Sequence, residues 1–475
     1  MKNILLLGSG LMSETVVDYL LQRPENYIMI ASNIEKDAQA IAIRKQRCNS
    51  SYVDVKNDQS LQSLIQNVDI VISYVPAVFH PLIAKVCLKL KKNLVTASYI
   101  SPEMAAMDKE VRDSNLTFLN EIGLDPGIDH LATMKTIDEV HEKGGKIIEY
   151  ESWCGGLPSP EHCNNPLGYK FSWSPIGALS ALANDAKYLD NGEIKIIQGQ
   201  DLLYNSEPKD ICIALRLEGY PNRDSLNYQN IYNLKDCKKV LRGTLRYIGF
   251  STIINSFKEL GLFSKEIATQ NESWLSYFER ITEEKKPQND QTIQEVKQFI
   301  LDQNNDVKTQ LLLQKMINIV LSNKNYLNLN IQEKLNIAKL TINAIKYFEF
   351  FNQNHQLSNE KTILENLCSL LEKKISLGPS ETDLVVMQHI FKIQYKDSDK
   401  IITRKSTLIM LGEKNGKTAM ALTVGTPTGV AAQLILDGVI IEKGVIIPNK
   451  KSIYEPISLL LEKENIRCVE TETDQ

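Results

Sequence analysis

The sequence of 475 residues has no long apolar run, no secretion signal and little net charge. No apolar stretch approaches the roughly 20 residues that a membrane-spanning helix needs, and the chain starts directly in a strand-like pattern rather than in a signal peptide. The net charge of −4 gives no electrostatic reason to expect nucleic acid or an anionic membrane as a partner. These absences predict a cytoplasmic protein that binds neither nucleic acid nor membranes.

The sequence also lacks the patterns of common metal and hydrolytic sites. Its eight cysteines are scattered singly, without a Cys-x-x-Cys pair or a Cys/His ligand spacing, so we expect reduced thiols and no metal. No Ser/His/Asp constellation for nucleophilic catalysis is evident. His80 and His130 are interpreted as structural, and Asp129 with His130 is not expected to bind a metal.

The N-terminus, in contrast, carries a glycine turn directly after an apolar run. Residues 4–14 read Ile-Leu-Leu-Leu-Gly-Ser-Gly-Leu-Met-Ser-Glu, which is how a dinucleotide-binding βαβ unit begins. Gly8 permits the tight turn, and Gly10 lets the main chain approach a pyrophosphate at the start of the next helix. Ser13 replaces the third glycine, and its small side chain still permits close packing of the helix on the strand.

Strand and helix patterns alternate over the first 130 residues. A helix is predicted from Ser13 to Leu21, and apolar runs at 27–31, 53–55, 68–75 and 94–97 predict strands. This alternation favours an α/β fold with a doubly wound, Rossmann-type parallel sheet.

The end of the second strand bears on the choice of cofactor. Ser32 and Asn33 stand where an acidic residue would bind the ribose of NAD, and Lys36 and Arg44 follow, so NADP is preferred while NAD stays possible. The residues predicted to bind the cofactor are Gly8, Gly10, Leu11, Met12, Ser13, Ser32, Asn33, Asp54, Val55, Val75, Pro76, Thr96, Ala97 and Ser98.

The rest of the chain changes character twice, and its length calls for two or three domains. Residues 131–255 are strand-like with Gly/Pro-rich turns, 256–375 have helical periodicity, and strands return at 383–395, 401–411 and 417–424. We predict a Rossmann-type domain from 1–130 plus 425–475, a mixed α/β substrate domain from 131–255 plus 376–424, and a helical insertion from 256–375.

Eight motifs follow one another along the chain: Gly8-Ser-Gly10, Tyr74-Val-Pro-Ala-Val-Phe-His-Pro81, Thr96-Ala-Ser-Tyr-Ile-Ser-Pro102, Asn120-Glu-Ile-Gly-Leu-Asp-Pro-Gly-Ile-Asp-His130, Trp153-Cys-Gly-Gly-Leu-Pro158, Asn165-Pro-Leu-Gly-Tyr-Lys-Phe-Ser-Trp-Ser174, Gly219-Tyr-Pro-Asn-Arg-Asp-Ser225 and Arg242-Gly-Thr-Leu-Arg-Tyr247. Together they resemble the saccharopine dehydrogenases of the L-glutamate-forming type, also called saccharopine reductases. The resemblance is most specific over 1–255, recurs over 379–436 and is weakest in the helical part. With no lysine-ketoglutarate reductase module ahead, the chain resembles the stand-alone enzyme.

The resemblance implies an NAD(P)-dependent oxidoreductase of α-aminoadipate lysine metabolism. Such an enzyme interconverts saccharopine with L-glutamate and 2-aminoadipate 6-semialdehyde through an imine that receives the nicotinamide hydride. Saccharopine carries three carboxylates, and arginine is the residue suited to hold them. The family positions that match here imply substrate contacts by Ser98, Tyr99, Asp125, Ser174, Arg223, Gly243, Thr244, Leu245 and Arg246.

Three residues are candidates for proton transfer: Asp125, Tyr99 and Cys154. The resemblance places Asp125 at the substrate nitrogen, while its sequence context also fits an Asx-turn or a helix cap. Cys154 could shuttle a proton or be inert core. Ser101 is interpreted as the cap of the helix that Pro102 opens.

Other roles stay open. Arg223 could form a surface ion pair with Asp224, and Arg242 could hold substrate or pack two domains together. Trp153 and Trp173 are expected to pack around the pocket.

Two other functions remain as alternatives: an imine reductase of the carboxynorspermidine or homospermidine type, and a catalytically silent NADP-binding regulator. The arginines oppose a polyamine product, and the intact site residues oppose the regulator. The expected partners are small-molecule substrates. The sequence also leaves a homodimer possible. The direction of the reaction, toward lysine biosynthesis or degradation, stays open.

Overall fold

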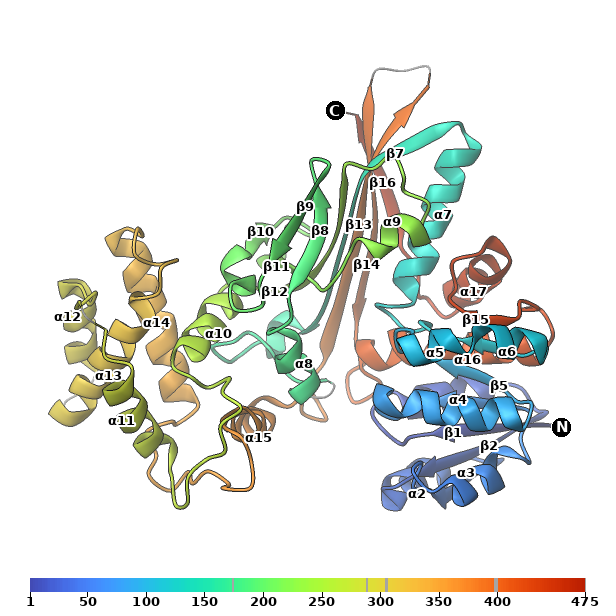
Figure 1. Ribbon diagram of the computed structural model, residues 1–475, viewed down its shortest axis with the longest axis horizontal. Coiled ribbons are helices and arrows are strands. Elements are labelled where there is room, and N and C mark those ends of the chain that lie inside the picture. The colour runs from blue at the N-terminus through green and yellow to red at the C-terminus, as the bar shows by residue number, and fades with distance from the viewer. Residues whose placement is uncertain (173–174, 288, 304–305, 397–399, 475) are drawn as a thin grey trace.

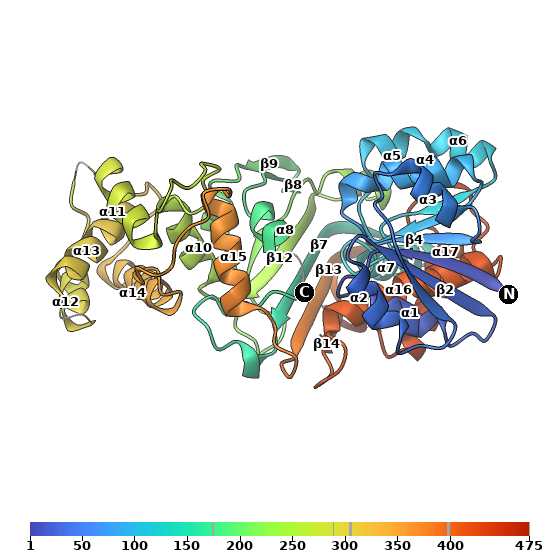
Figure 2. The same cartoon turned by 90° about the horizontal axis from the view of Figure 1, so that it is seen from below.

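The computed structural model describes residues 1–475 except 173–174, 288, 304–305, 397–399 and 475. Two β-sheets and a block of helices follow one another along the molecule, with the second sheet in the middle (Figure 1). Viewed from below, the helical block and the first sheet stand at opposite ends (Figure 2). The α/β class with a Rossmann-type sheet, a second mixed sheet and inserted helices is confirmed.

The first sheet is parallel, in the order β15-β6-β5-β4-β1-β2-β3. Its strands are β1 (Lys2–Leu7), β2 (Asn26–Ser32), β3 (Cys48–Tyr52), β4 (Ile70–Ser73), β5 (Asn93–Thr96), β6 (Thr117–Leu119) and β15 (Gly444–Ile446). The strand expected at 53–55 is wrong: β3 ends at Tyr52, and Val53 already belongs to the connection that follows. The chain crosses over between β1 and β4, which neighbour each other, so ligands should gather at their carboxyl ends.

Helices cover both faces of this sheet, which is why its strands are apolar on both sides. Leu5 and Leu7 face α3 (Asp58–Ile65), α4 (His80–Lys89), α5 (Pro102–Ala106) and α6 (Asp108–Asp113), in one apolar cluster. Ile4 and Leu6 face α1 (Ser13–Leu20), α2 (Glu35–Ala42) and α16 (Ala419–Leu436). A short 3-10 turn, η1 (Ala77–Phe79), precedes α4. As expected, Ser101 caps α5, because its Oγ accepts from the amide of Met104 at 3.2 Å.

Helix α16 corrects two expectations. The strand predicted at 417–424 is wrong, because Thr418 accepts from the amide of Ala421 and so starts a helix there. The helix has 18 residues and a mean hydropathy of 1.4, so by length and composition it could cross a membrane, contrary to the sequence reading. However, 78% of it is buried inside the protein, which is typical of a core helix. Gly425 and Gly429 let it pack closely on Thr15 and Tyr19 of α1.

The C-terminal segment divides between the two sheets. Strand β15 extends the first sheet beside β6, and α17 (Lys451–Lys463) packs on α16 and on α7 (Ile128–Glu142). The last strand, β16 (Val469–Asp474), pairs instead with β14 of the second sheet. Residues 425–475, predicted to join the Rossmann-type domain as a whole, therefore contribute a strand to each sheet. The start of the predicted strand-like region is also different, since 131–142 lie in α7.

The second sheet is mixed and runs β10-β11-β12-β7-β13-β14-β16. Its strands are β7 (Gly145–Pro158), β10 (Glu207–Lys209), β11 (Leu217–Pro221), β12 (Lys239–Tyr247), β13 (Asp383–Tyr395), β14 (Ile401–Leu411) and β16, with β8 (Ala186–Asp190) and β9 (Glu193–Ile197) as a side branch. Short helices between them are η2 (Pro160–His162), α8 (Pro175–Ala181), η3 (Leu202–Asn205) and α9 (Asn227–Ile231). Among the described strands of this sheet, β7 and β12 are the pair that runs in parallel.

The helical block lies beyond the second sheet and has its own core. It consists of α10 (Phe250–Glu259), α11 (Trp274–Glu284), α12 (Gln294–Gln303), α13 (Val307–Leu321), α14 (Ile331–Tyr347) and α15 (Ile363–Ile375). Phe257, Phe278, Phe348 and Phe350 fill its centre without measurable exposure. Helix α12 lies within the polar segment 284–309.

Candidate active site between the two sheets

The turn after β1 has the geometry of a dinucleotide-binding loop. Gly8 has φ +107°, and a Cβ there would stand 3.1 Å from the carbonyl of Tyr74. The hydroxyl of Ser13 donates to the carbonyl of Gly8 at 3.0 Å, so the small residue in place of the third glycine ties helix to turn. A side chain other than glycine at position 8 would therefore be strained and crowded.

The same turn leaves donors for a phosphate. Within the described residues, the amides of Gly10, Leu11 and Met12 have no hydrogen-bond acceptor, and a Cβ on Gly10 would meet only open space. These amides precede α1, where main-chain N–H groups and the helix dipole favour an anion. The chain therefore fits the pyrophosphate of a nicotinamide dinucleotide.

The tip of β2 is polar and carries no carboxylate at its first two positions. The hydroxyl of Ser9 donates to that of Ser32 at 2.9 Å, which fixes Ser32 beside the glycine turn, and Asn33 is exposed. Lys36 and Arg44 are the two cations expected near this tip. Arg44 forms an ion pair with Glu14 at 3.2 Å. Among the other predicted cofactor contacts, Asp54 and Val55 follow β3, and Val75 and Pro76 follow β4, all at the carboxyl edge of the sheet.

His80 organises the ends of β4 and β5. Its Nδ1 lies 3.1 Å from the hydroxyl of Ser73, and its Nε2 lies 2.9 Å from that of Ser98 and 3.1 Å from that of Thr96. Burial lowers the pKa of His80 to about 4, so the ring is neutral at pH 7. The hydroxyls of Thr96 and Ser98, predicted to contact ligands, are bound to this ring instead. The structural role expected for His80 agrees with these contacts.

A cavity of about 400 Å³ lies between the turns of the first sheet and the face of the second. The first domain contributes Met12, Ala97, Tyr99, Gly123, Leu124, Asp125, Pro126, Met420 and Val424, and the second contributes Cys154, Gly156, Ala178, Ala181, Leu182, Tyr220, Asn222, Arg223, Thr244 and Arg246. Residues from five separate motifs thus meet in one place. Ser174 lies outside the described residues.

Strand alternation decides which residues of the second sheet reach this cavity. Thr244 pairs with Cys154 in the parallel register, and both line the cavity together with Arg246. Trp153 points to the opposite face, where a Cβ on Gly243 would lie 2.1 Å from its indole. The expectation that Trp153 packs around the pocket is therefore wrong, because neighbouring residues of a strand face opposite sides. Trp173 lies outside the described residues.

The same alternation affects two predicted substrate residues. Leu245 is fully buried in the apolar cluster around Trp153, and Gly243 makes room for that indole. Only the main-chain atoms of Gly243 and Leu245 are left for the substrate contacts that the resemblance implies.

Arg246 is a buried cation that has no acidic partner among the residues that the structure describes. It is 7% exposed, its Nη1 donates to the carbonyl of Leu245 at 2.7 Å, and its Nε has no hydrogen-bond partner. The rings of Tyr169 and Phe250 lie 4.9 and 5.3 Å from the guanidinium carbon. A buried guanidinium with spare donors is a favourable site for a carboxylate.

Asp125 lines the same cavity as Arg246 and belongs to a compact polar group. The hydroxyl of Tyr99 donates to Asp125 at 3.2 Å, and the guanidinium of Arg242 contacts the same carboxylate oxygen. Arg242 also binds Asp129 at 2.9 Å and lies 3.3 Å from the hydroxyl of Tyr99. The packing role that the sequence left open for Arg242 is thus real, because it joins the second sheet to the turn before α7.

The two aspartates differ in their titration. Burial raises the pKa of Asp125, and the negative charge of Asp129 adds to this, while Arg242 opposes it. Burial also acts to raise the pKa of Asp129, but the charges of His130 and Arg242 outweigh it and lower that pKa. Of the two carboxyls, Asp125 is therefore the one that takes up a proton more readily. It is also the one that lines the cavity.

Cys154 lines the cavity as a thiol. Burial raises the pKa of Cys154 well above its ordinary value, and the nearby carboxylates of Asp125 and Asp129 act in the same direction. A thiolate is therefore disfavoured there, and a thiol that gives up its proton so reluctantly is poorly suited to shuttle one.

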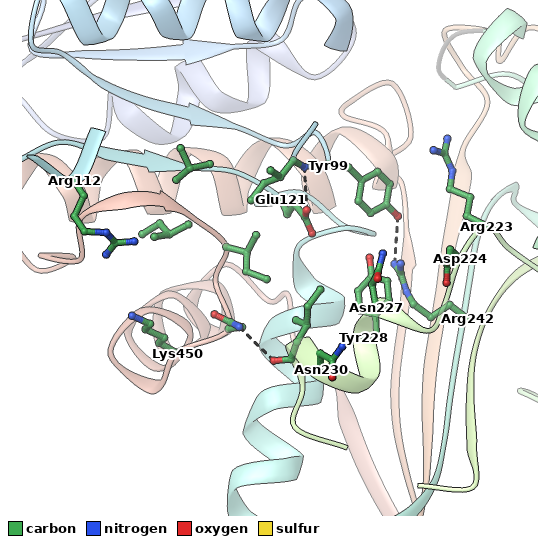
Figure 3. A pocket seen from close by; sticks show the side chains of 16 residues that line it. Tyr99, Arg112, Glu121, Arg223, Asp224, Asn227, Tyr228, Asn230, Arg242 and Lys450 are labelled. Carbon is green, nitrogen blue, oxygen red and sulfur yellow. Dashed lines mark hydrogen bonds between the residues drawn. The ribbon is translucent and has the colours of Figure 1, made fainter. Parts of the chain in front are cut away.

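A larger cavity, of about 760 Å³, lies on the other side of Tyr99 and Arg223, which line both spaces. Arg242, Tyr228 and Asp224 form one wall, and Arg112 and Lys450 stand at the far end (Figure 3). The guanidinium carbon of Arg223 lies 5.5 Å from the ring centre of Tyr99. The side chain of Arg223 therefore reaches the boundary between the two cavities, and no ion pair with Asp224 is found in the described part of the chain.

Sequence reasoning missed Tyr220 and Asn222, which line the substrate side of the cavity. Both precede Arg223, and Tyr220 lies opposite Thr244 in the antiparallel register of β11 and β12. Their position beside Arg223, with Tyr220 near the end of β11 and Asn222 directly after it, was the signal that could have found them.

Comparisons with known proteins agree with this architecture. A family model described as "Saccharopine dehydrogenase NADP binding domain" matches residues 4–119, and one described as "Saccharopine dehydrogenase C-terminal domain" matches residues 123–466. A solved structure of apo saccharopine dehydrogenase (L-Glu forming) from Saccharomyces cerevisiae superposes with a TM-score of 0.86, at 33% identity and with 100% of each chain covered.

Curated relatives fall into two length classes. The chain is 35% identical to the saccharopine dehydrogenase [NADP(+), L-glutamate-forming] of Schizosaccharomyces pombe, with 100% of both chains covered. It is 37% identical to the mitochondrial alpha-aminoadipic semialdehyde synthase of Rattus norvegicus, with 98% of this chain covered but only 47% of the relative. The chain thus spans about half the length of the synthases.

Proposed function

We propose a function from one premise: this chain belongs to the saccharopine dehydrogenase family, whose models match almost its whole length. It acts as an NADP-dependent oxidoreductase that interconverts saccharopine with L-glutamate and 2-aminoadipate 6-semialdehyde. The relatives of matching length are named for this activity with NADP and L-glutamate. The substrate is a secondary amine that carries three carboxylates, and the cavity between the sheets offers groups of the complementary kinds.

The buried, unpartnered guanidinium of Arg246 is the observation that carries the proposal. A cation that is 7% exposed and has no protein carboxylate within ion-pair distance, in the described part of the chain, is costly unless a ligand supplies the counter-charge. Its planar donors suit a carboxylate in a bidentate arrangement. Arg223, at the mouth shared by the two cavities, is placed for a second carboxylate.

Asp125 and Tyr99 are proposed to handle the proton of the substrate amine. In the oxidative direction the amine loses a proton from nitrogen while its carbon loses a hydride, and water then cleaves the resulting imine. Asp125 lines the same cavity as Arg246, and it takes up a proton more readily than Asp129 does. Its hydrogen bond from Tyr99 orients the carboxylate toward the cavity.

NADP, when bound, supplies the hydride acceptor, and the chain itself supplies its cradle. The free amides of Gly10, Leu11 and Met12 hold the pyrophosphate, and Met12 and Ala97 line the cavity where the reacting carbon must lie. Met420 and Val424 close the same end with apolar side chains, which keeps bulk water from the hydride step. Ser32 and Asn33 are proposed to face the 2′-phosphate of NADP, because neither repels it.

The test is NADPH formation, followed at its near-ultraviolet absorbance, with saccharopine as the only added substrate. The proposal expects NADPH and L-glutamate in equal amounts, and less NADH when NAD replaces NADP. Asn33→Asp should move the preference toward NAD, because a carboxylate there repels the phosphate and binds a ribose hydroxyl. Absence of saccharopine-dependent NADPH formation would reject the assignment.

Three further points concern the location of the protein, its assembly and the direction of the reaction. The protein works in the cytoplasm, in keeping with eight cysteines that are all free, and cell fractionation tests this. It forms a homodimer, one of the assemblies that the sequence left open, which light scattering tests. The reaction serves lysine biosynthesis or degradation according to the supply of NADPH and saccharopine, which isotope tracing would decide.

A further inference from the structure

We propose that Arg242 and Asp129 are positioning residues for Asp125: together they fix its carboxylate against Tyr99 and set how readily it takes up a proton. The inference rests on the proposed function, since it assigns a task to two residues that do not line the substrate cavity. It concerns a buried charge group formed by two carboxylates and one guanidinium.

The guanidinium of Arg242 joins parts of the chain that are far apart in sequence. It starts on β12 of the second sheet and binds Asp129, in the first turn of α7, at 2.9 Å. The same nitrogen contacts the carboxylate of Asp125 and lies 3.3 Å from the hydroxyl of Tyr99. One planar group thus holds the turn that carries Asp125 against the sheet that carries Arg246.

The guanidinium cannot rotate away easily. It is 5% exposed, and its central carbon lies 4.1 Å from the ring centre of Tyr228, a stacking distance. Figure 3 shows Arg242 between Tyr228 and Tyr99, with its end directed at the hydroxyl of Tyr99. This fixed plane is a property of arginine that the single ammonium of a lysine does not reproduce.

A second set of contacts holds Tyr99 from its other end. Glu121 accepts from the amide of Ile100 at 3.0 Å and pairs with His130 at 2.9 Å. Asp129 accepts from the amide of His130 at 2.8 Å, and Tyr232 contacts the other ring nitrogen of His130 at 2.8 Å. The contacts therefore run in a closed circuit from Asp125 through Arg242, Asp129, His130 and Glu121 back to Tyr99. Each member of the circuit fixes the next.

Asp125 lies between opposite charges in this circuit. Arg242 favours its ionised form and Asp129 disfavours it, while the hydroxyl of Tyr99 donates to it and His130 adds a weaker positive charge. The thiol of Cys154, on β7, is the other titratable group that senses Asp125. Removing Arg242 or Asp129 must then change the pKa of Asp125 in opposite directions, which a merely structural role would not produce.

The experiment compares Arg242→Gln and Asp129→Asn by the pH profile of kcat/KM for saccharopine oxidation. Oxidation needs ionised Asp125 as the proton acceptor, so activity falls as the pH drops through its pKa. Arg242→Gln should move this acid limb upward by about one pH unit or more, and Asp129→Asn should move it downward. Asp129→Asn keeps the size of the side chain, so it remains informative if Arg242→Gln does not fold.

Arg404→Gln is the matched control. Arg404 is also a buried arginine, 4% exposed, but it binds Glu472 and Glu139 away from both cavities. This variant should lose stability and leave the acid limb in place. Arg242→Lys keeps the positive charge, so its acid limb should lie close to that of the unmodified protein. Its kcat should stay reduced, because lysine lacks the planar guanidinium.

The inference is overturned if the two variants move the limb in the same direction or leave it unmoved. Failure of this inference can also be distinguished from failure of the proposed function. If the unmodified protein oxidises no saccharopine, the proposed function fails, and the pKa of Asp125 measured by carboxyl NMR in the same variants decides the inference. Opposite shifts of the Asp125 pKa in the two variants support the circuit, and the same pKa in both contradicts it.

Discussion

Glu218 lies directly opposite Arg246 in the register of β11 and β12, yet the two do not pair. The carboxylate of Glu218 accepts from the amides of Gly249 and Ser251, at 3.1 and 2.7 Å, at the start of α10. The nearest acid on the same sheet face is therefore committed to a helix N-terminus, where a negative charge is favourable. Arg246 is left with spare donors toward the cavity. The proposed recognition of an acidic substrate depends on Glu218 binding the amides of α10 and not Arg246.

The glycine turn gives a prediction about cofactor binding. Gly8→Ala should weaken NADP binding about tenfold or more, because the residue has φ +107° and the new Cβ would meet the carbonyl of Tyr74 at 3.1 Å. Fluorescence titration with NADPH measures this. Gly192→Ala is the control, since that residue also has positive φ, +80°, but nothing lies within 4 Å. Equal affinity in the two variants would contradict a cofactor role for the turn.

The buried ring of His80 predicts a stability effect of pH. Its pKa of about 4 in the folded protein lies below the unfolded value of about 6.5. A neutral ring thus favours folding above pH 6.5, and this contribution, ~3 kcal/mol, is lost as the pH falls toward 4. Urea unfolding at several pH values measures this effect. The free energy of unfolding should fall less steeply with falling pH in His80→Gln than in the unmodified protein. His141→Gln, an exposed position on α7, should leave the slope unchanged.

The thiol of Cys154 should be unreactive. Because burial raises its pKa, iodoacetamide at pH 8 should label the more exposed Cys163 and Cys212 before Cys154, as read by peptide mass spectrometry. Bound saccharopine should slow the labelling of Cys154 further and leave Cys163 unaffected. Labelling of Cys154 first would show a thiolate in the cavity.

The opposite face of the second sheet gives a packing prediction. Gly243→Ala should destabilise the protein by about 1–3 kcal/mol, because its Cβ would lie 2.1 Å from the indole of Trp153. Thermal unfolding measures the loss. Trp153→Phe in the same chain should recover part of it, since the shorter ring vacates that space. Equal losses with and without the tryptophan replacement would contradict the assigned contact.

Local sequence signals predicted the first sheet and its glycine turn well. Gly8 and the apolar run before it act within a few residues, and the helical spacing of Val16, Val17, Leu20 and Leu21 predicted α1. The faces of β7 were predictable in principle, because Cys154 and Trp153 must alternate. The assignment of Trp153 to the pocket failed because the sequence does not say which face meets the first domain.

Contacts between distant segments were not predictable in this way. The start of α16 is fixed by Asp383, whose carboxylate accepts from the amides of Ala419 and Met420. Thr418 is a local cap signal that the strand prediction overlooked, while nothing near 417–424 points to the contacts with Asp383. Arg242 is a similar case: its partners lie on α7 and on the turn before it, more than a hundred residues earlier. Its role follows only once the two sheets are placed together.

The affinity of the cavity for saccharopine tests the central claim most directly. Isothermal titration of the NADP-loaded protein should show binding that Arg246→Gln weakens by about 10- to 100-fold, which corresponds to one lost charge-assisted contact. Arg280→Gln, a change on the helical block away from the cavity, should bind as the unmodified protein does. Equal saccharopine affinity in the Arg246→Gln variant and the unmodified protein would contradict the account.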